Sequence, residues 1–188
     1  MAQHTQAPRL APLRPPYDGA IQKRLDAIMP DGVPPLTLFT TLARNPRVFE
    51  RMMSGGLLDK GTLTLRQREL MIDRTTARCG AEYEWGVHMT FFGERVAVTK
   101  EQSASIVRGT PQDACWDTEN DRLILRMADA LHDTSTIDDA LWADLAAEFS
   151  DEQIIELVVL AGYYHTISFC CRAFNLDVEE FGARFDAA

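Results

Sequence analysis

A glutamate and a histidine spaced four residues apart are the side chains of this sequence best suited to proton chemistry. Glu84 and His88 lie in segment 78–93, which has glycines at positions 80 and 93 and is typical of a helix of about three turns. Residues four positions apart lie on one helix face, so the carboxylate and the imidazole are within reach of each other. Aromatic and aliphatic residues cover most of the remaining positions, which predicts a buried helix. The pair is therefore either a structural contact or an acid–base pair that faces a pocket.

The preceding segment adds charged residues of both signs. Arg66, Arg68, Glu69 and Asp73 form the polar face of a helix predicted at 65–78. A guanidinium group matches the geometry of a carboxylate, so Arg66 or Arg68 could bind a substrate; the alternative is a solvated helix face. Glu69 and Asp73 are one helical turn apart, and their carboxylates repel each other unless one of them is paired.

A third group of polar residues lies in the most hydrophobic helix that the sequence predicts. Tyr163, Tyr164 and His165 follow one another there, and buried tyrosine hydroxyls need hydrogen-bond partners. A histidine in such a helix is either a hydrogen-bonded core residue or a pocket residue. We expect His165 to share one pocket with the acid–base pair. The other two histidines, His4 and His132, have polar neighbours and are expected at the surface.

Metal binding is an alternative role for the same residues. Glu69, Glu84, His88 and His165 could in principle form a site with two carboxylates and two imidazoles. The sequence lacks the H-E-x-x-H motif of zinc peptidases and the repeated Glu-x-x-His motif of di-iron bundles. We therefore predict no metal and no cofactor.

Composition restricts the class of protein and its partners. The 188 residues are 46% hydrophobic and 25% charged, which is typical of one soluble globular domain. The net charge of −9 disfavours nucleic acid and anionic membranes as partners. The longest apolar run, 154–174, contains charged residues and predicts a buried helix rather than a membrane span. The N-terminus lacks a signal-peptide pattern, and the four cysteines lack C-x-x-C spacing, which together favour a cytoplasmic protein with reduced thiols.

Helical periodicity extends from residue 36 almost to the C-terminus, so the fold is predicted to be all-α. Residues 1–35 contain seven of the nine prolines. They predict an N-terminal arm, either ordered or disordered, ahead of a single helical domain at 36–188. Threonine or serine followed three residues later by glutamine predicts three helix starts, and Thr136 with Asp139 predicts a weaker fourth. The predicted helices cover about 18–28, 65–78, 80–93, 100–108, 118–132, 137–148 and 151–174, with shorter ones near 36–42 and 48–53.

Two stretches of the sequence carry a resemblance to a known family. They read L-R-Q-R-E-L at 65–70 and R-C-G-A-E-Y-E-W-G-V-H at 78–88. The order of these residues resembles the carboxymuconolactone decarboxylase family, which shares its fold with alkylhydroperoxidase D, and the similarity is strongest over 45–108. The resemblance implies an alkylhydroperoxidase D-like helical bundle that assembles into trimers or hexamers, with pockets close to the subunit contacts.

The peroxidase branch of this family uses a glutamate and a C-x-x-C-x-x-x-H motif, whose cysteines cycle between dithiol and disulfide. Placed on this sequence, the histidine falls on His88 and the glutamate on Glu69, but the cysteine positions fall on Ala81 and Glu84. Both thiols are missing, which removes that mechanism. A peroxiredoxin-like activity through Cys79, two residues before the first of these positions, stays an alternative.

The decarboxylase branch keeps a glutamate four residues before the histidine and needs no cofactor. The resemblance then implies that His88 donates or accepts a proton, that Glu84 orients it, and that a small carboxylate, lactone or enolisable acid is the substrate. A non-catalytic oligomer that binds a ligand is the third possibility. The predicted catalytic residues are His88, Glu84 and Glu69, and the predicted substrate contacts are Arg66, Arg68, Trp85, Tyr163, Tyr164 and His165.

Overall fold

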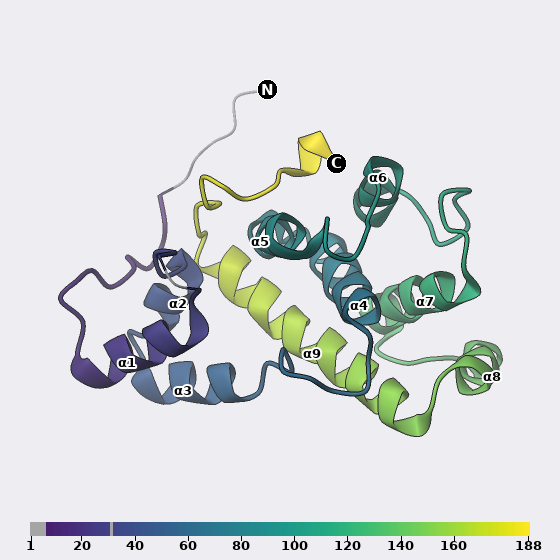
Figure 1. Cartoon of the computed structure of the whole chain (residues 1–188), viewed down its shortest axis with the longest axis horizontal. Coiled ribbons are helices and arrows are strands. Elements are labelled where there is room, and N and C mark those ends of the chain that lie inside the picture. Colours follow the sequence, from purple (N-terminus) through teal and green to yellow (C-terminus); the bar gives the residue numbers. More distant parts are fainter. Residues whose placement is uncertain (1–6, 31) are drawn as a thin grey trace.

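The chain folds into helices joined by loops (Figure 1). The computed structural model describes residues 7–30 and 32–188, and no β-strand occurs within these ranges. The predicted all-α fold is confirmed, whereas His4, expected at the surface, lies outside the described residues. The helices are α1 (Gly19–Ile28), α2 (Thr37–Leu42), α3 (Pro46–Ser54), α4 (Leu65–Arg78), α5 (Glu82–Phe92), α6 (Lys100–Arg108), α7 (Glu119–Thr134), α8 (Asp139–Glu148), α9 (Asp151–Ala173) and the short 3-10 helix η1 (Phe185–Ala187).

Helices α4 and α9 form the centre of the molecule. In Figure 1, α9 runs obliquely through the middle, and α4 packs against α5, α6, α7 and α9. Three consecutive residues of α4, Leu70, Met71 and Ile72, are fully buried, so protein surrounds this helix on every side. Its polar residues Glu69 and Asp73 are buried as well. The alternative of a solvated helix face is therefore wrong for these two carboxyl groups, which need partners inside the protein.

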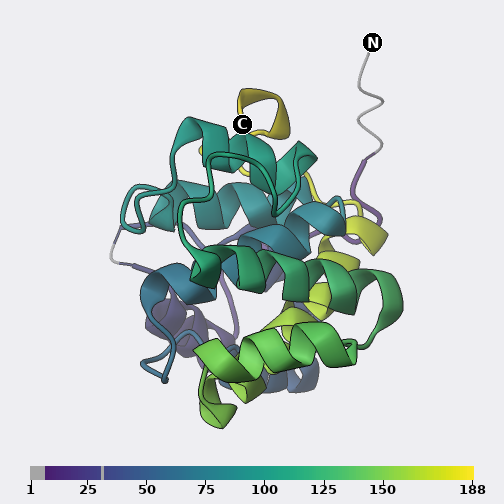
Figure 2. The ribbon, with the colours of Figure 1, turned by 90° about the vertical axis from the view of Figure 1, so that its right-hand side faces the viewer.

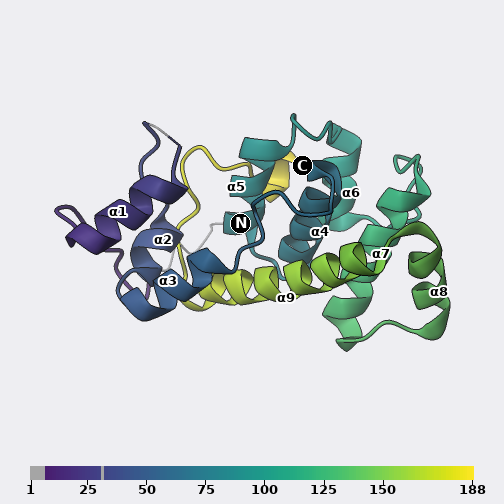
Figure 3. The ribbon, with the colours of Figure 1, turned by 60° about the horizontal axis from the view of Figure 1, so that its bottom comes forward.

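The remaining helices gather at the two ends of α9. Figure 3 shows α9 lengthwise, with α1, α2 and α3 at one end, α7 and α8 at the other, and α4, α5 and α6 along its side. Figure 2 looks from the second of these ends, and the green ribbons of α7 and α8 are nearest the viewer. Tyr163 of α9 donates a hydrogen bond of 2.7 Å from its hydroxyl to the carbonyl of Met52 in α3. The N-terminal helices are thereby attached to the C-terminal half of α9.

The described part of the Pro-rich arm packs on its own domain. The backbone N–H groups of Arg9 and Leu13 donate to the carbonyls of Phe174 and Thr40. Helix α1 follows, contacts α3, and buries Leu25 completely. Of the two alternatives for the arm, an ordered segment is correct for these residues. The domain boundary at residue 35 stays a prediction.

Side-chain caps begin most of the helices, as the sequence predicts. Helix α7 is capped by Thr118, which accepts a hydrogen bond from the backbone of Asp121. The prediction for α8 is wrong, because Asp138 rather than Thr136 accepts from the backbone N–H of Leu141. The three predicted capping boxes are confirmed at Thr64 with Gln67, Thr99 with Gln102, and Ser150 with Gln153.

A glycine in α5 allows the C-terminal segment to cross that helix. Ala183 donates from its backbone N–H to the carbonyl of Gly86 over 3.1 Å. A Cβ atom added at Gly86 would lie 2.3 Å from the carbonyl oxygen of Ala183, so only glycine fits this crossing. The hydroxyl of Thr90, one turn further on, donates to the carbonyl of Phe181. These contacts fix α5, the helix that carries Glu84 and His88.

Helix α9 has the length and composition of a membrane span, although it forms part of the core. Its 23 residues are numerous and apolar enough to cross a membrane, by length and composition alone. Leu157, Leu160 and Tyr164 are buried against neighbouring helices, as expected for the buried helix that the sequence predicts. On its outer side, Ile155 and Phe169 are 62% and 63% exposed. That no membrane is a partner stays a prediction.

Candidate active site

His88 lies between the two glutamates that were predicted to act with it. Its Nδ1 atom is 2.7 Å from Oε2 of Glu69, and its Nε2 atom is 3.5 Å from Oε1 of Glu84. All three side chains are buried. That Glu84 orients His88 stays a prediction, and the shorter contact joins His88 to Glu69. Helix spacing brings Glu84 close to the ring, whereas the packing of α4 against α5 supplies the closer carboxylate.

Tyr164 completes the contacts of the imidazole from α9. Its hydroxyl is 3.1 Å from Nε2 of His88, and the two rings meet edge to face at a centroid distance of 5.1 Å. Burial raises the pKa of Tyr164 well above its ordinary value, and the charges of Glu84 and Glu69 add to this effect. The phenol therefore stays neutral and can accept a hydrogen bond from a protonated ring nitrogen.

The electrostatic environment favours a charged His88. Burial alone would lower its pKa, but the charge and hydrogen bond of Glu69, together with those of Glu84, raise the pKa of His88 to about 10. Burial likewise opposes the ionised form of Glu69, yet His88 and Arg68 hold the pKa of Glu69 below its ordinary value. At neutral pH the pair is thus an imidazolium and a carboxylate. One ring N–H donates to Glu69, and the other points toward Glu84 and Tyr164.

Asp73, one helical turn from Glu69 on α4, is a further buried carboxyl group close to this pair. Burial and the charge of Glu69 raise its pKa well above the ordinary value for aspartate, although His88 opposes the shift. These effects favour the protonated form of Asp73, which would relieve the repulsion expected between Glu69 and Asp73. Within residues 7–30 and 32–188, Oδ1 of Asp73 and Oε2 of Glu84 have no hydrogen-bond partner. Both atoms are buried, and Glu84 also lines a cavity.

A cavity of about 520 Å³ lies next to the buried acid–base pair, which forms part of its wall. Glu84 and His88 contribute to its wall from α5, and Tyr163 and Tyr164 from α9. Its size suits a small molecule, and most of the wall is hydrophobic. The hydrophobic lining comes from the N-terminal helices, the loop after α3, α5 and α9: Ile28, Met29, Leu36, Phe39, Met53, Leu57, Leu58, Val87, Phe91, Phe92 and Ile167.

The two predicted substrate-binding arginines are engaged within the protein. Arg66 forms a salt bridge of 2.7 Å with Asp121 and donates to the carbonyl of Val96. Arg68 forms a salt bridge of 2.6 Å with Glu69 and donates to the carbonyl of Leu58, and its guanidinium lies over the ring of Phe92. Neither arginine lines the cavity of His88. The salt bridge of Arg68 instead holds the carboxylate of Glu69 and stabilises its charge.

Two further predicted contacts lie away from this cavity. Trp85 is buried against Phe185, at a ring distance of 5.1 Å. His165 is the residue after Tyr164, and consecutive residues of a helix point about 100° apart. Because Tyr164 faces His88, His165 faces another side of α9. The expectation of one pocket shared by His88 and His165 is therefore wrong.

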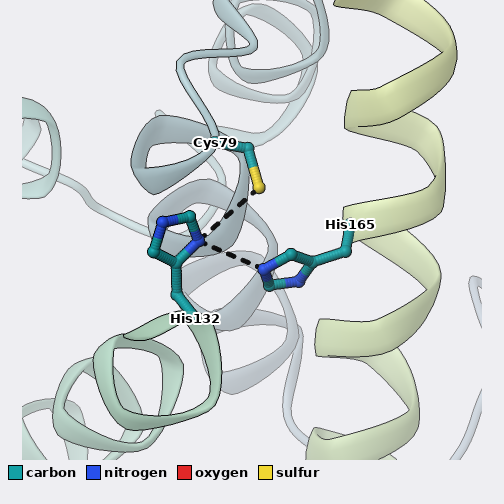
Figure 4. Close-up of side chains that lie close together, drawn as sticks. All are labelled: Cys79, His132 and His165. Atoms are coloured by element: carbon teal, nitrogen blue, oxygen red, sulfur yellow. Dashed lines mark hydrogen bonds between the residues drawn. The ribbon is translucent and has the colours of Figure 1, made fainter. Parts of the chain in front are cut away.

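His165 contributes instead to a second cluster, which sequence reasoning missed. Figure 4 shows it with Cys79, at the end of α4, and His132, in the last turns of α7. Nδ1 of His132 is 3.2 Å from Nε2 of His165 and 3.8 Å from Sγ of Cys79. His132 was expected at the surface and is half-buried there, where it lines a cavity. The three residues belong to three different helices, and their spacing in the sequence does not predict that they lie close together.

Solved structures with the same architecture confirm the predicted fold. An uncharacterized peroxidase-related protein with an alkylhydroperoxidase AhpD core, from Ralstonia eutropha JMP134, is 16% identical, with a TM-score of 0.77 over 91% of this chain and 93% of that one. An uncharacterized peroxidase-related protein from Silicibacter sp. TM1040 is 17% identical, with a TM-score of 0.76 over 98% and 99% of the two chains. The debrominase Bmp8 is 12% identical, with a TM-score of 0.68 over 92% of each chain.

These likenesses establish a fold rather than an activity. No family model matches the sequence, and no curated protein sequence does. The chain has the alkylhydroperoxidase D-like fold, so the predicted resemblance is confirmed at the level of architecture.

Proposed function

We propose that this protein is a cofactor-independent acid–base enzyme of the carboxymuconolactone decarboxylase type. Its reaction is the decarboxylation or isomerisation of a small carboxylate or lactone. The observation that carries the proposal is the position of His88, whose Nδ1 is 2.7 Å from a buried carboxylate while the residue lines a cavity of about 520 Å³. An imidazole held and polarised in this way is a typical general acid or base.

Each residue of the site has a distinct role in the proposed reaction. Glu69 positions His88 and keeps its ring protonated, and Arg68 holds Glu69 in turn. Nε2–H of His88 delivers a proton to the carbon that becomes electron-rich as carbon dioxide leaves. In an isomerisation, the carboxylate of Glu84, which lines the cavity, removes a proton and His88 supplies one at the new position. Tyr164 orients the ring through Nε2.

The lining of the cavity indicates the class of substrate. Its charged lining residues are Asp59, Glu84 and His88, within a mostly hydrophobic wall. The one cationic group among them is the imidazolium of His88, because Arg66 and Arg68 are engaged elsewhere. A compact substrate with a single carboxylate or lactone carbonyl fits this arrangement, since that group would be bound at the point where the proton is transferred.

A thiol peroxidase is the second candidate, since two of the structural neighbours are named peroxidase-related proteins. Their fold is compatible with both candidates. Burial raises the pKa of the Cys79 thiol, although Arg172 and Arg78 oppose this effect, so the reactive thiolate is disfavoured. The positions that hold cysteines in the peroxidase branch are occupied by Ala81 and Glu84. These features favour proton chemistry at His88.

Deuterium uptake from heavy water into a panel of lactone acids and enolisable carboxylates tests the proposal. We expect Glu84→Gln and His88→Ala each to lower the rate by about 10²–10⁴, the range for a lost general acid or base. Glu101→Gln is the matched control, because Glu101 is exposed on α6. Uptake that both site variants retain, or a hydroperoxide turnover that requires Cys79 and survives in His88→Ala, would contradict the proposal.

We also propose a homo-oligomer, a trimer or a hexamer, as the family resemblance implies. The exposed apolar residues Ile155, Val159 and Phe169 lie along the outer face of α9 and support a subunit contact there. Trp142 on α8 is half exposed as well.

A further inference from the structure

We propose that Cys79, His132 and His165 form a binding site for Zn²⁺ that is separate from the cavity of His88. One thiol and two imidazoles are ligands that zinc prefers, and their ligand atoms all lie within 4.8 Å of one another. The residues come from α4, α7 and α9, three helices that pack on one another in the core. The backbone elements that carry the ligands are therefore held in place before an ion binds (Figure 4).

The distances within the cluster resemble those of a tetrahedral site. With Zn–N bonds of about 2.05 Å and a Zn–S bond of about 2.3 Å, tetrahedral ligands are about 3.3 Å apart for two nitrogens and about 3.6 Å for nitrogen and sulfur. The corresponding distances are 3.2 Å between His132 and His165, and 3.8 Å between His132 and Cys79. The remaining distance, between Sγ of Cys79 and Nε2 of His165, is at most 4.8 Å and would have to shorten when an ion binds.

Hydrogen bonds around the cluster hold two of its ligands, His165 and Cys79, in place. Nδ1 of His165 is 2.8 Å from the carbonyl of Ala161 and must donate to it, which leaves the lone pair of Nε2 directed toward His132. Such a bond to the distal nitrogen is the usual way in which proteins orient a metal-binding histidine. Arg172 donates to the carbonyl of Cys79 over 2.6 Å and fixes the backbone at that residue.

The cluster lines a cavity of about 950 Å³, so a fourth ligand position is accessible. Three protein ligands with an open position are characteristic of zinc sites that bind water or an exchangeable anion, whereas closed structural sites use four protein ligands. Two arginines also line the cavity: Arg78 is paired with Asp129 and Asp133, and Arg172 donates to the carbonyl of Cys79. Binding of Zn²⁺ would release the thiol proton of Cys79 to solvent, and the thiolate would become the anionic ligand.

Cobalt substitution tests this inference on the full-length protein. Chelator-treated protein is titrated with Co²⁺, followed by visible spectroscopy, and then with Zn²⁺. We expect one equivalent to bind, with the absorption of a tetrahedral Co²⁺–thiolate centre that Zn²⁺ abolishes. Azide should change these bands by occupying the open position. Bands that azide leaves unchanged would refute the open position, and the absence of saturable one-to-one binding would refute the site.

Variants assign the ligands. Cys79→Ser should remove the thiolate absorption, and His132→Asn and His165→Asn should each weaken Zn²⁺ binding by more than about 10²-fold, since the loss of a supporting hydrogen bond alone costs 10- to 100-fold. Cys115→Ser and His4→Asn are the matched controls and should bind normally. X-ray absorption of the zinc form of the parent protein, which needs no variant to fold, should show one sulfur at about 2.3 Å and two nitrogens at about 2.0–2.1 Å. A shell without sulfur, or unchanged binding in Cys79→Ser, would overturn the assignment.

Discussion

Replacing Glu69 by glutamine removes the charge that keeps His88 protonated, while it nearly preserves the shape of the side chain. In the parent protein the pKa of His88 is about 10, compared with an ordinary value of 6.5. This difference corresponds to at most about 5 kcal/mol of preference for the imidazolium. Burying the charge of Glu69 costs free energy in the parent protein, and the variant avoids this cost. Glu69→Gln should therefore lower the free energy of unfolding by less than this limit.

The pH dependence of this loss follows from the directions of the two pKa changes. The folded-state pKa of His88 is raised, so its contribution to stability is fully present below pH 6.5 and disappears as the pH rises to about 10. The folded-state pKa of Glu69 is lowered, so its contribution is present above its ordinary value of 4.5 and disappears as the pH falls. We therefore expect Glu69→Gln to lower the free energy of unfolding most near pH 6, and progressively less toward pH 10.

Two measurements check this prediction. NMR titration of the histidine rings should show His88 charged at pH 8 in the parent protein and neutral at pH 8 in Glu69→Gln. Urea unfolding at several pH values gives the stability difference, with the exposed Glu101→Gln as control. A loss of stability that grows with pH, or a charged His88 at pH 9 in the variant, would refute the assigned pair.

Three further predictions concern packing, metal and assembly. Gly86→Ala should lower the free energy of unfolding by about 1–3 kcal/mol, because its Cβ would lie 2.3 Å from the carbonyl oxygen of Ala183. Gly162→Ala in α9 should raise the free energy of unfolding by up to about 1 kcal/mol, because no atom lies within 4 Å of the added Cβ. Equal effects of the two substitutions in urea unfolding would contradict this prediction. A chelator should leave the deuterium uptake at His88 unchanged, and a metal ion whose removal abolishes this uptake would show that the acid–base assignment is wrong. Light scattering should return three or six times the chain mass of 21.1 kDa, and a monomer at micromolar concentration would count against the proposed assembly.

The helices could be predicted from the sequence because local signals determine where they begin and end. The three capping boxes are formed by residues three positions apart, so no tertiary contact is needed to recognise them. The proximity of Glu84 to His88 is likewise a property of one helix. The role of Glu69 is different, because its contact with His88 depends on how α4 packs against α5. The sequence grouped the two residues only as one possible metal site and through the family resemblance.

The remaining parts of the site depend on tertiary structure. Asp73 and Glu69 resemble surface residues of a polar helix in sequence, and their burial follows from α4 being surrounded by other helices. The position of His165 was partly predictable, because a helix cannot direct both Tyr164 and His165 toward one imidazole. The proximity of Cys79 to His132 was not, because it requires the ends of α4 and α7 to meet beside α9.

The pH profile of deuterium uptake tests the central claim, that protonated His88 is the proton donor. On the best substrate of the panel, the rate should stay high at neutral pH and fall as the pH rises toward about 10, where His88 loses its proton. In Glu69→Gln the same fall should occur at least two pH units lower. A parent profile that falls near pH 6.5, or a profile that Glu69→Gln leaves unmoved, would contradict the claim.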